Sequence, residues 1–168
     1  MTKKDIKTFI HSACELGAFE AKLVEAASIA TAPWVRLKCR FGCDGYNTSL
    51  CCPPNTPTYL EMREVISSYK HALLIHCKDT ASPTRIVCLL ERQIFLSGYY
   101  KAFGLGAGPC QLCSKCNLKR CTHTENTRPS MEACGIDVYA TVRANGYPLV
   151  VVKDYTDKAN YYGLVLIE

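Results

Sequence analysis

The sequence contains no apolar stretch long enough to cross a membrane. A transmembrane helix needs roughly 18 consecutive apolar residues, whereas the longest apolar runs, Leu149–Val152 and Leu164–Ile167, have the length of strands. Charged residues near the N-terminus are not followed by an unbroken apolar segment, so we expect no secretory signal peptide. These absences predict a cytoplasmic protein that contacts no membrane.

The sequence also lacks a dense basic block. The 20 Lys and Arg residues exceed the 15 Asp and Glu residues by five, but they are spread along the chain. Nucleic-acid interfaces concentrate positive charge on one face, so a nucleic-acid partner is disfavoured. Internal repeats, low-complexity segments and clear linkers are missing as well, and 168 residues match one domain. We therefore predict a single domain over residues 1–168.

Cysteine, in contrast, is abundant, with 12 residues in the chain. A chain of this length can bury a hydrophobic core without disulfide bonds. In a reducing compartment the thiols stay free, which favours metal ligation or thiol chemistry over disulfides. The cysteine count thus directs attention to metal sites.

The pattern of apolar residues predicts an α/β or α+β fold, with a small mixed sheet flanked by helices and two Cys-rich loops near one edge. Capping boxes at Thr2 with Asp5 and at Thr58 with Glu61 mark two helix starts, and Gly17 is a helix stop. The expected helices are Thr2–Leu16, a segment beginning near Thr58, a segment from Ser82-Pro83 toward Phe103, one or two turns within Arg128–Gly135, and Asp137–Ala144. The expected strands are Ala21–Val24, Trp34–Cys39, His71–Cys77, Leu149–Lys153 and Gly163–Glu168, the last two as a hairpin or as sheet neighbours.

Three cysteines, Cys14, Cys77 and Cys88, lie alone within helix or strand patterns. An isolated free cysteine usually behaves as a small buried hydrophobe. We expect these three in the core, which leaves nine cysteines in two loops and one flanking turn.

The second loop contains the most informative spacing, Cys110-x2-Cys113-x2-Cys116. Three thiolates at this spacing can wrap one face of a 4Fe-4S cluster while a more distant cysteine supplies the fourth ligand. Zinc sites more often combine two separate Cys-x2-Cys knuckles, so iron-sulfur is favoured over zinc. Cys121 and Cys134 are candidate fourth ligands, and either could instead belong to a second site.

The first loop offers a second set, Cys39-x3-Cys43 followed by Cys51-Cys52-Pro-Pro. Adjacent residues rarely bind one metal together, and Cys52, directly before Pro53, is the better candidate; the role of Cys51 stays open. His123 is more typical of a solvated loop residue than of a ligand. The predicted ligands permit two four-cysteine sites: Cys39, Cys43, Cys52, Cys110, Cys113, Cys116, Cys121 and Cys134.

Several motifs together resemble a family of Cys-rich proteins known as predicted metal-binding proteins, found in anaerobic bacteria and methanogenic archaea. The resemblance covers about Gly17 to Glu168 and rests on Val35-Arg-Leu-Lys-Cys39-x3-Cys43-x-Gly45-Tyr46, Cys52-Pro-Pro, Gly98-Tyr-Tyr-Lys-Ala-Phe, Gly108-Pro-Cys110-x-Leu-Cys113-x2-Cys116, Arg128-Pro-Ser-Met-Glu-Ala-Cys134-Gly-Ile-Asp and Tyr162-Gly-Leu-Val-Leu. It implies a metal-binding, iron-sulfur protein without an agreed reaction. The family pattern has one cysteine before Pro-Pro, which supports Cys52 and makes Cys51 a departure.

Three functions fit these observations. The first is an iron-sulfur protein with one or two 4Fe-4S clusters that exchanges electrons with a redox partner protein in anaerobic metabolism, since no acid-base or nucleophile constellation is evident. The second is an enzyme whose cluster has an open iron beside a small-molecule substrate pocket lined by Arg128, Glu132 or Asp137, with desulfuration or dehydration as examples. The third is a zinc-stabilised binding module that presents Lys115, Lys119 and Arg120 to an acidic partner.

Overall fold

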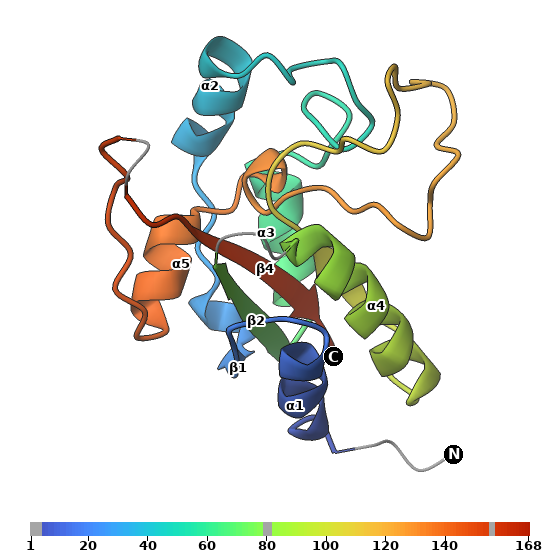
Figure 1. Ribbon diagram of the computed structural model, residues 1–168, viewed down its shortest axis with the longest axis vertical. Coiled ribbons are helices and arrows are strands. Elements are labelled where there is room, and N and C mark those ends of the chain that lie inside the picture. The colour runs from blue at the N-terminus through green and yellow to red at the C-terminus, as the bar shows by residue number, and fades with distance from the viewer. Residues whose placement is uncertain (1–4, 79–81, 155–156) are drawn as a thin grey trace.

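A four-stranded antiparallel sheet forms the centre of the molecule (Figure 1). The computed structural model describes residues 5–78, 82–154 and 157–168. Strands β1 (Glu20–Glu25), β2 (His71–Lys78), β3 (Phe103–Leu105) and β4 (Asn160–Leu166) lie in the order β1-β2-β4-β3. The central strands β2 and β4 are buried along most of their length, as their apolar runs predict.

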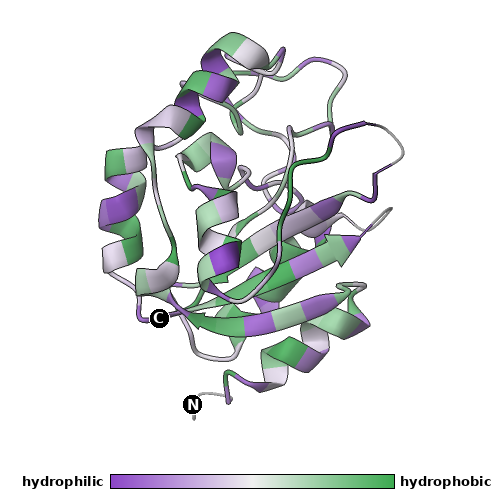
Figure 2. Ribbon diagram, turned by 90° about the vertical axis from the view of Figure 1, so that its left-hand side faces the viewer, coloured by the Kyte–Doolittle hydropathy of each residue, from purple (hydrophilic) through white to green (hydrophobic). Residues whose placement is uncertain are grey.

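The two faces of the sheet belong to separate hydrophobic cores. Side chains alternate across a strand, so Leu73 and Ile75 of β2 face α1 (Thr8–Glu15) and α4 (Pro83–Leu96), while Leu74 lies in the opposite core. That second core includes residues of α3 (Tyr59–Ser67) and α5 (Val138–Ala144). In Figure 2 the N-terminal helix lies below the sheet, and other helices lie above it. This arrangement confirms the α+β class.

Several predicted helix ends are confirmed, but two are wrong. α1 begins at Thr8, and α4 ends at Leu96, shortly before Gly98 with φ +99°, so Phe103 lies in β3 and not in the helix. Thr58 and Glu61 form the complete capping box, and the Ser82 and Asp137 side chains accept hydrogen bonds from the first turns of α4 and α5. Gly17 ends the first helical segment with φ +108°, a conformation that glycine adopts readily. The predicted cap at Thr2 lies outside the described residues.

The predicted strand Trp34–Cys39 is wrong, because this segment is part of the helix α2 (Pro33–Gly42). Pro33 occupies the first helical turn, where its fixed φ favours a helix and its missing N–H costs nothing. Val35 is buried, whereas Leu37 and Phe41 are exposed, so the helix packs along a narrow face. Cys39 is therefore presented by a helix and not by a strand end.

The predicted strand Leu149–Lys153 is also wrong, and the predicted hairpin with it. Both edges of β4 are already paired, one with β2 and the other with β3, so β4 has no free edge for another strand. The short strand β3, which the sequence pattern missed, occupies the predicted position. The described sheet is consequently antiparallel throughout, not mixed.

Two short helical turns complete the fold: η1 (Ala26–Ser28) and η2 (Glu132–Cys134). Isolated bridges join Thr31 to Ile136 and Gly106 to Ser130, which attaches both sides of η2 to the rest of the molecule. No described helix is long and apolar enough to span a membrane. The two Cys-rich loops lie side by side at one end of the molecule, at the top of Figure 1.

Candidate metal centre

Eight thiols gather around two cavities where the Cys-rich loops meet. Site I consists of Cys39, Cys43 and Cys52, which line a cavity of about 180 Å³ together with Glu132. Site II consists of five thiols around a narrower cavity: Cys51, Cys110, Cys113, Cys116 and Cys121. The site II cavity encloses only about 30 Å³, so a metal group larger than a few waters has to displace the loop outward.

Arg36 fixes the helix that carries Cys39 and precedes Cys43. From α2, its guanidinium donates hydrogen bonds to the Pro57 carbonyl oxygen and, at 2.9 Å, to the Ala133 carbonyl oxygen. The Thr56 hydroxyl donates to the same Ala133 oxygen. Because three segments distant in sequence meet at one carbonyl, the α2 side of site I is attached to both α3 and η2.

Gly135 allows the turn after η2 to lie very close to the start of α3, beside site I. Its φ is +77°, and a Cβ built there would lie 2.7 Å from the Tyr59 Cβ. No side chain larger than hydrogen fits that gap without displacing α3. The turn after Cys134 therefore depends on glycine for both space and conformation.

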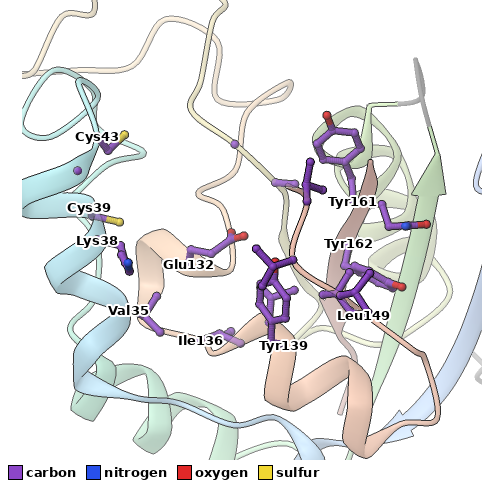
Figure 3. Close-up of a pocket in the computed structure, with 18 of the residues that line it drawn as sticks. Val35, Lys38, Cys39, Cys43, Glu132, Ile136, Tyr139, Leu149, Tyr161 and Tyr162 are labelled. Atoms are coloured by element: carbon purple, nitrogen blue, oxygen red, sulfur yellow. The ribbon is translucent and has the colours of Figure 1, made fainter. Parts of the chain in front are cut away.

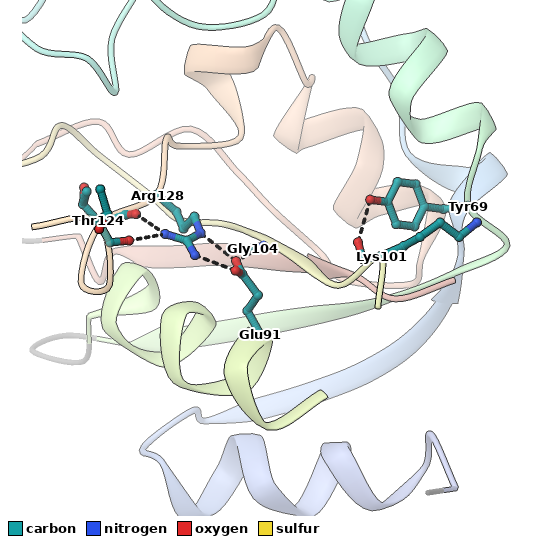
Figure 4. Close-up of polar contacts among 7 residues, drawn as sticks. Tyr69, Glu91, Lys101, Gly104, Thr124 and Arg128 are labelled. Atoms are coloured by element: carbon teal, nitrogen blue, oxygen red, sulfur yellow. Dashed lines mark hydrogen bonds and ion pairs between the residues drawn. The ribbon is translucent and has the colours of Figure 1, made fainter. Parts of the chain in front are cut away.

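An ion pair anchors the site II loop to the sheet (Figure 4). Arg128 donates from Nε, at 2.6 Å, and from a terminal nitrogen to the two carboxylate oxygens of Glu91 on α4. Glu91 also accepts the backbone N–H of Gly104 in β3, at 2.7 Å. Arg128 additionally donates to the Thr124 and Thr127 carbonyl oxygens, which holds the exit of the loop in place.

The adjacent cysteines Cys51 and Cys52 belong to different sites. Cys51 lines the site II cavity, and its Sγ lies 3.2 Å from the Thr127 hydroxyl. Cys52 lines the site I cavity, where its Sγ and that of Cys43 flank Gly45. The sequence left Cys51 open, because neighbouring residues rarely bind one metal; the structure gives each neighbour its own cavity.

A larger pocket adjoins site I (Figure 3). It has a volume of about 1010 Å³ and includes Cys39 and Cys43 in its wall. Of the three residues expected beside a substrate pocket, only Glu132 lines it, and its side chain points into the space in Figure 3. Arg128 is instead paired with Glu91, and Asp137 caps α5.

Comparison with known proteins gives one match. The model of the family described as predicted metal-binding protein (DUF2284) matches residues 22–167. The chain belongs to this family. Searches of the curated proteins and of the solved structures find no match.

The donor set suits the metal binding that the DUF2284 name describes. Thiolates bind soft and borderline metals, and backbone N–H groups directed at sulfur stabilise the thiolate. Two such bonds are present: Gly45 N–H to Cys43 Sγ and His123 N–H to Cys121 Sγ, each with an N–S distance of 3.3 Å. His123 thus contributes its backbone to site II. Within the described ranges, no three Cys, His, Asp or Glu side chains are grouped closely enough to hold a single ion as they stand.

Burial governs the acidity of three thiols at the two sites, Cys39, Cys51 and Cys52. It raises the pKa of Cys52 to about 11, and the neighbouring thiol of Cys43 adds to the effect. Burial also raises the pKa of Cys39 and of Cys51. These thiols are protonated at neutral pH, so metal binding at them would release protons.

Cys134, a predicted ligand, lies in the larger hydrophobic core and lines neither cavity. Burial raises its pKa to about 12, while Arg36 opposes that shift and the thiols of Cys51 and Cys39 add to it. Cys134 is thus near both sites, and its ligand role stays a prediction. Cys77 and Cys88 are buried as predicted, whereas Cys14, expected in the core, is exposed because it lies on the outer face of α1.

Proposed function

We propose that this DUF2284 protein is an iron-sulfur protein with one or two 4Fe-4S clusters. The first cluster would lie in site II, and the second would lie in site I. The observation that carries the proposal is the convergence of five thiols on one cavity: the Cys110-x2-Cys113-x2-Cys116 spacing, Cys121, and Cys51 from the other loop. Three closely spaced cysteines plus a remote one is the ligand pattern of ferredoxin-type clusters. In site I, Cys39, Cys43 and Cys52 would be ligands, with the buried Cys134 as a candidate fourth ligand.

A bound cluster would supply one-electron transfer between this protein and a redox partner in anaerobic metabolism. The chain's own residues hold and tune such a group. The N–H donors of Gly45 and His123 would stabilise negative charge on Cys43 and Cys121, which raises the reduction potential. Lys115, Lys119 and Arg120 are exposed on the site II loop, where they would attract an acidic partner.

The test is anaerobic purification followed by iron and acid-labile sulfide determination and electron paramagnetic resonance of the reduced protein. About four irons and four sulfides are expected per filled site. Cys113→Ser should lose the site II iron, and Cys14→Ser, an exposed cysteine outside both sites, should lose none. A colourless protein with stoichiometric zinc would refute the iron-sulfur proposal and favour the zinc-stabilised binding module.

The assignment of neighbouring cysteines to different sites sharpens this test. If two clusters are present, Cys51→Ser should deplete iron from site II and Cys52→Ser from site I. The two variants should then retain different paramagnetic signals. Identical losses from both variants would contradict the separation of the two sites.

A second function, an enzyme with an open iron, is favoured by one specific observation. The large pocket shares Cys39 and Cys43 with site I, and site I has three thiols in its cavity wall. If Cys134 does not bind, one ligand position faces this space. A change in the site I signal when a small thiol such as 2-mercaptoethanol is added would support this function, and an unchanged signal would favour electron transfer alone.

A further inference from the structure

The pocket beside site I has the size and lining of a small-molecule site. Its volume of about 1010 Å³ is at the upper end of the roughly 300–1000 Å³ typical of ligand pockets. Residues of α2 form one wall, and residues of α5, β4 and the segment 149–153 form the other (Figure 3). The inference drawn from it adds a ligand to the proposed metal protein and does not depend on which metal is bound.

Much of the lining is apolar and otherwise unexplained. Val150, Val151 and Val152 are 74%, 66% and 48% exposed, although valine is normally buried, and all three line the pocket. No described strand pairs with this segment. Together with the buried Ile136 and Leu149, the three valines form an apolar surface that a bound molecule would cover.

The charged side chains that line the pocket are mostly basic. Near site I, Lys38 and Glu132 carry opposite charges (Figure 3). Lys153, Lys158 and Asp157 also line the pocket, and the Asp157 carboxylate already accepts the backbone N–H of Lys153 at 2.7 Å. Neither lysine ammonium has an ion-pair partner among the described residues. Three lysines and two carboxylates leave the lining with a net positive charge of one, so an anionic group is stabilised beside Lys153 and Lys158 but not beside Glu132.

We infer that the pocket binds an organic carboxylate with a large apolar body. The carboxylate lies against Lys153 and Lys158, and the apolar body covers Val150–Val152. Cys39 and Cys43 lie in the wall of the same pocket, so the bound molecule would be a neighbour of site I. The ligand class is thus a hydrophobic acid.

The experiment compares two probes with the same apolar body and different polar ends, the anion 2-naphthylacetate and the neutral alcohol 2-(2-naphthyl)ethanol. Isothermal titration calorimetry on anaerobically purified, metal-replete protein should show the acid binding about ten-fold more tightly, as one charged contact predicts. The double variant Lys153→Met/Lys158→Met should remove that preference and leave the alcohol unchanged. Val151→Asp, at an exposed position where the fold does not depend on valine, should weaken both probes.

Two lysines serve as matched controls. Lys38→Met alters the pocket lysine that lies near Glu132, and Lys7→Met alters an exposed lysine outside the pocket; both should keep the preference for the acid. Equal affinity for the two probes, or a preference for the acid that survives the double variant, would overturn the inference. Iron measured on the same sample separates the two proposals: iron without acid binding refutes only the pocket, and acid binding to iron-free protein refutes only the cluster.

Discussion

Replacing Arg128 with methionine tests whether the Glu91–Arg128 pair anchors the site II loop. The substitution keeps an unbranched side chain but removes four hydrogen bonds, two to the Glu91 carboxylate and two to carbonyl oxygens of the loop exit. Glu91 keeps a single partner, the N–H of Gly104. A carboxylate is then left in a largely dry environment without its cation.

The expected cost follows from burial. The Arg128 and Glu91 side chains are 19% and 15% exposed, so solvent can replace little of the lost interaction. Removing one partner of a buried ion pair costs about 3–5 kcal/mol. Because both side chains keep some contact with solvent, we expect a cost at the lower end of this range. We therefore expect Arg128→Met to lower the free energy of unfolding by about 3 kcal/mol. The double variant Glu91→Gln/Arg128→Met should be more stable than Arg128→Met, because it no longer buries an unpaired charge.

The assay is urea unfolding under anaerobic conditions, monitored by far-ultraviolet circular dichroism. Midpoints are compared only between variants whose free energy of unfolding falls with the same slope against urea concentration. Arg92→Met, one position along α4 and exposed, is the control and should change stability by less than about 0.5 kcal/mol. The reasoning fails if Arg128→Met costs less than about 1 kcal/mol. It also fails if the stability that the double variant loses equals the sum of the losses from Arg128→Met and from Glu91→Gln measured separately. The two side chains would then have no coupling free energy.

Three further predictions concern other parts of the molecule. Gly135→Ala should destabilise by about 2–4 kcal/mol in the same assay because its Cβ would overlap Tyr59, whereas Gly108→Ala, with φ +71° and no atom within 4 Å, should cost only about 1 kcal/mol; equal costs would exclude the overlap. Burial raises the pKa of Tyr147 to about 12, so the neutral phenol stabilises the fold fully below the ordinary tyrosine pKa and progressively less as pH rises toward 12. Tyr147→Phe should reduce the loss of thermal stability between about pH 10 and 12, and an unchanged pH profile would count against this assignment. Removing metal with a chelator should speed tryptic cleavage within 110–121, measured by mass spectrometry, because metal ligation orders this loop; a cleavage rate independent of metal would contradict site II.

The sequence predicted the buried strands and several helix ends because those signals are local. The capping box at Thr58 and the apolar run of β2 need no knowledge of the rest of the fold. Trp34–Cys39 was misassigned because a short segment that mixes apolar and basic residues suits a strand or a narrow-faced helix equally well. Pro33 was the available signal, since proline favours the first turn of a helix.

Leu149–Val152 shows a limit of a different kind. Its composition favours a strand, but a strand also needs a free edge, and β3 already occupies that edge of β4. Sheet order is a property of the whole chain, so no local pattern could exclude the pairing. The same holds for the cysteines: spacing identified eight candidate ligands, but only the arrangement of the loops separates Cys51 from Cys52 and adds Cys51 to site II.

The Cys51–Cys52 peptide joins the site I cavity to the site II cavity. A single peptide unit holds these residues about 3.8 Å apart at Cα, so ordering either cysteine fixes most of the backbone freedom of the other. In the proposed two-cluster protein, part of the conformational entropy lost when one site loads would already be lost when the second one loads, which would make occupancy positively cooperative. By thermodynamic reciprocity, each site would raise the affinity of the other by the same factor. Reconstitution of the unaltered chain should then give fewer half-loaded molecules than two independent sites would, whereas Cys51→Ser and Cys52→Ser keep one complete site each.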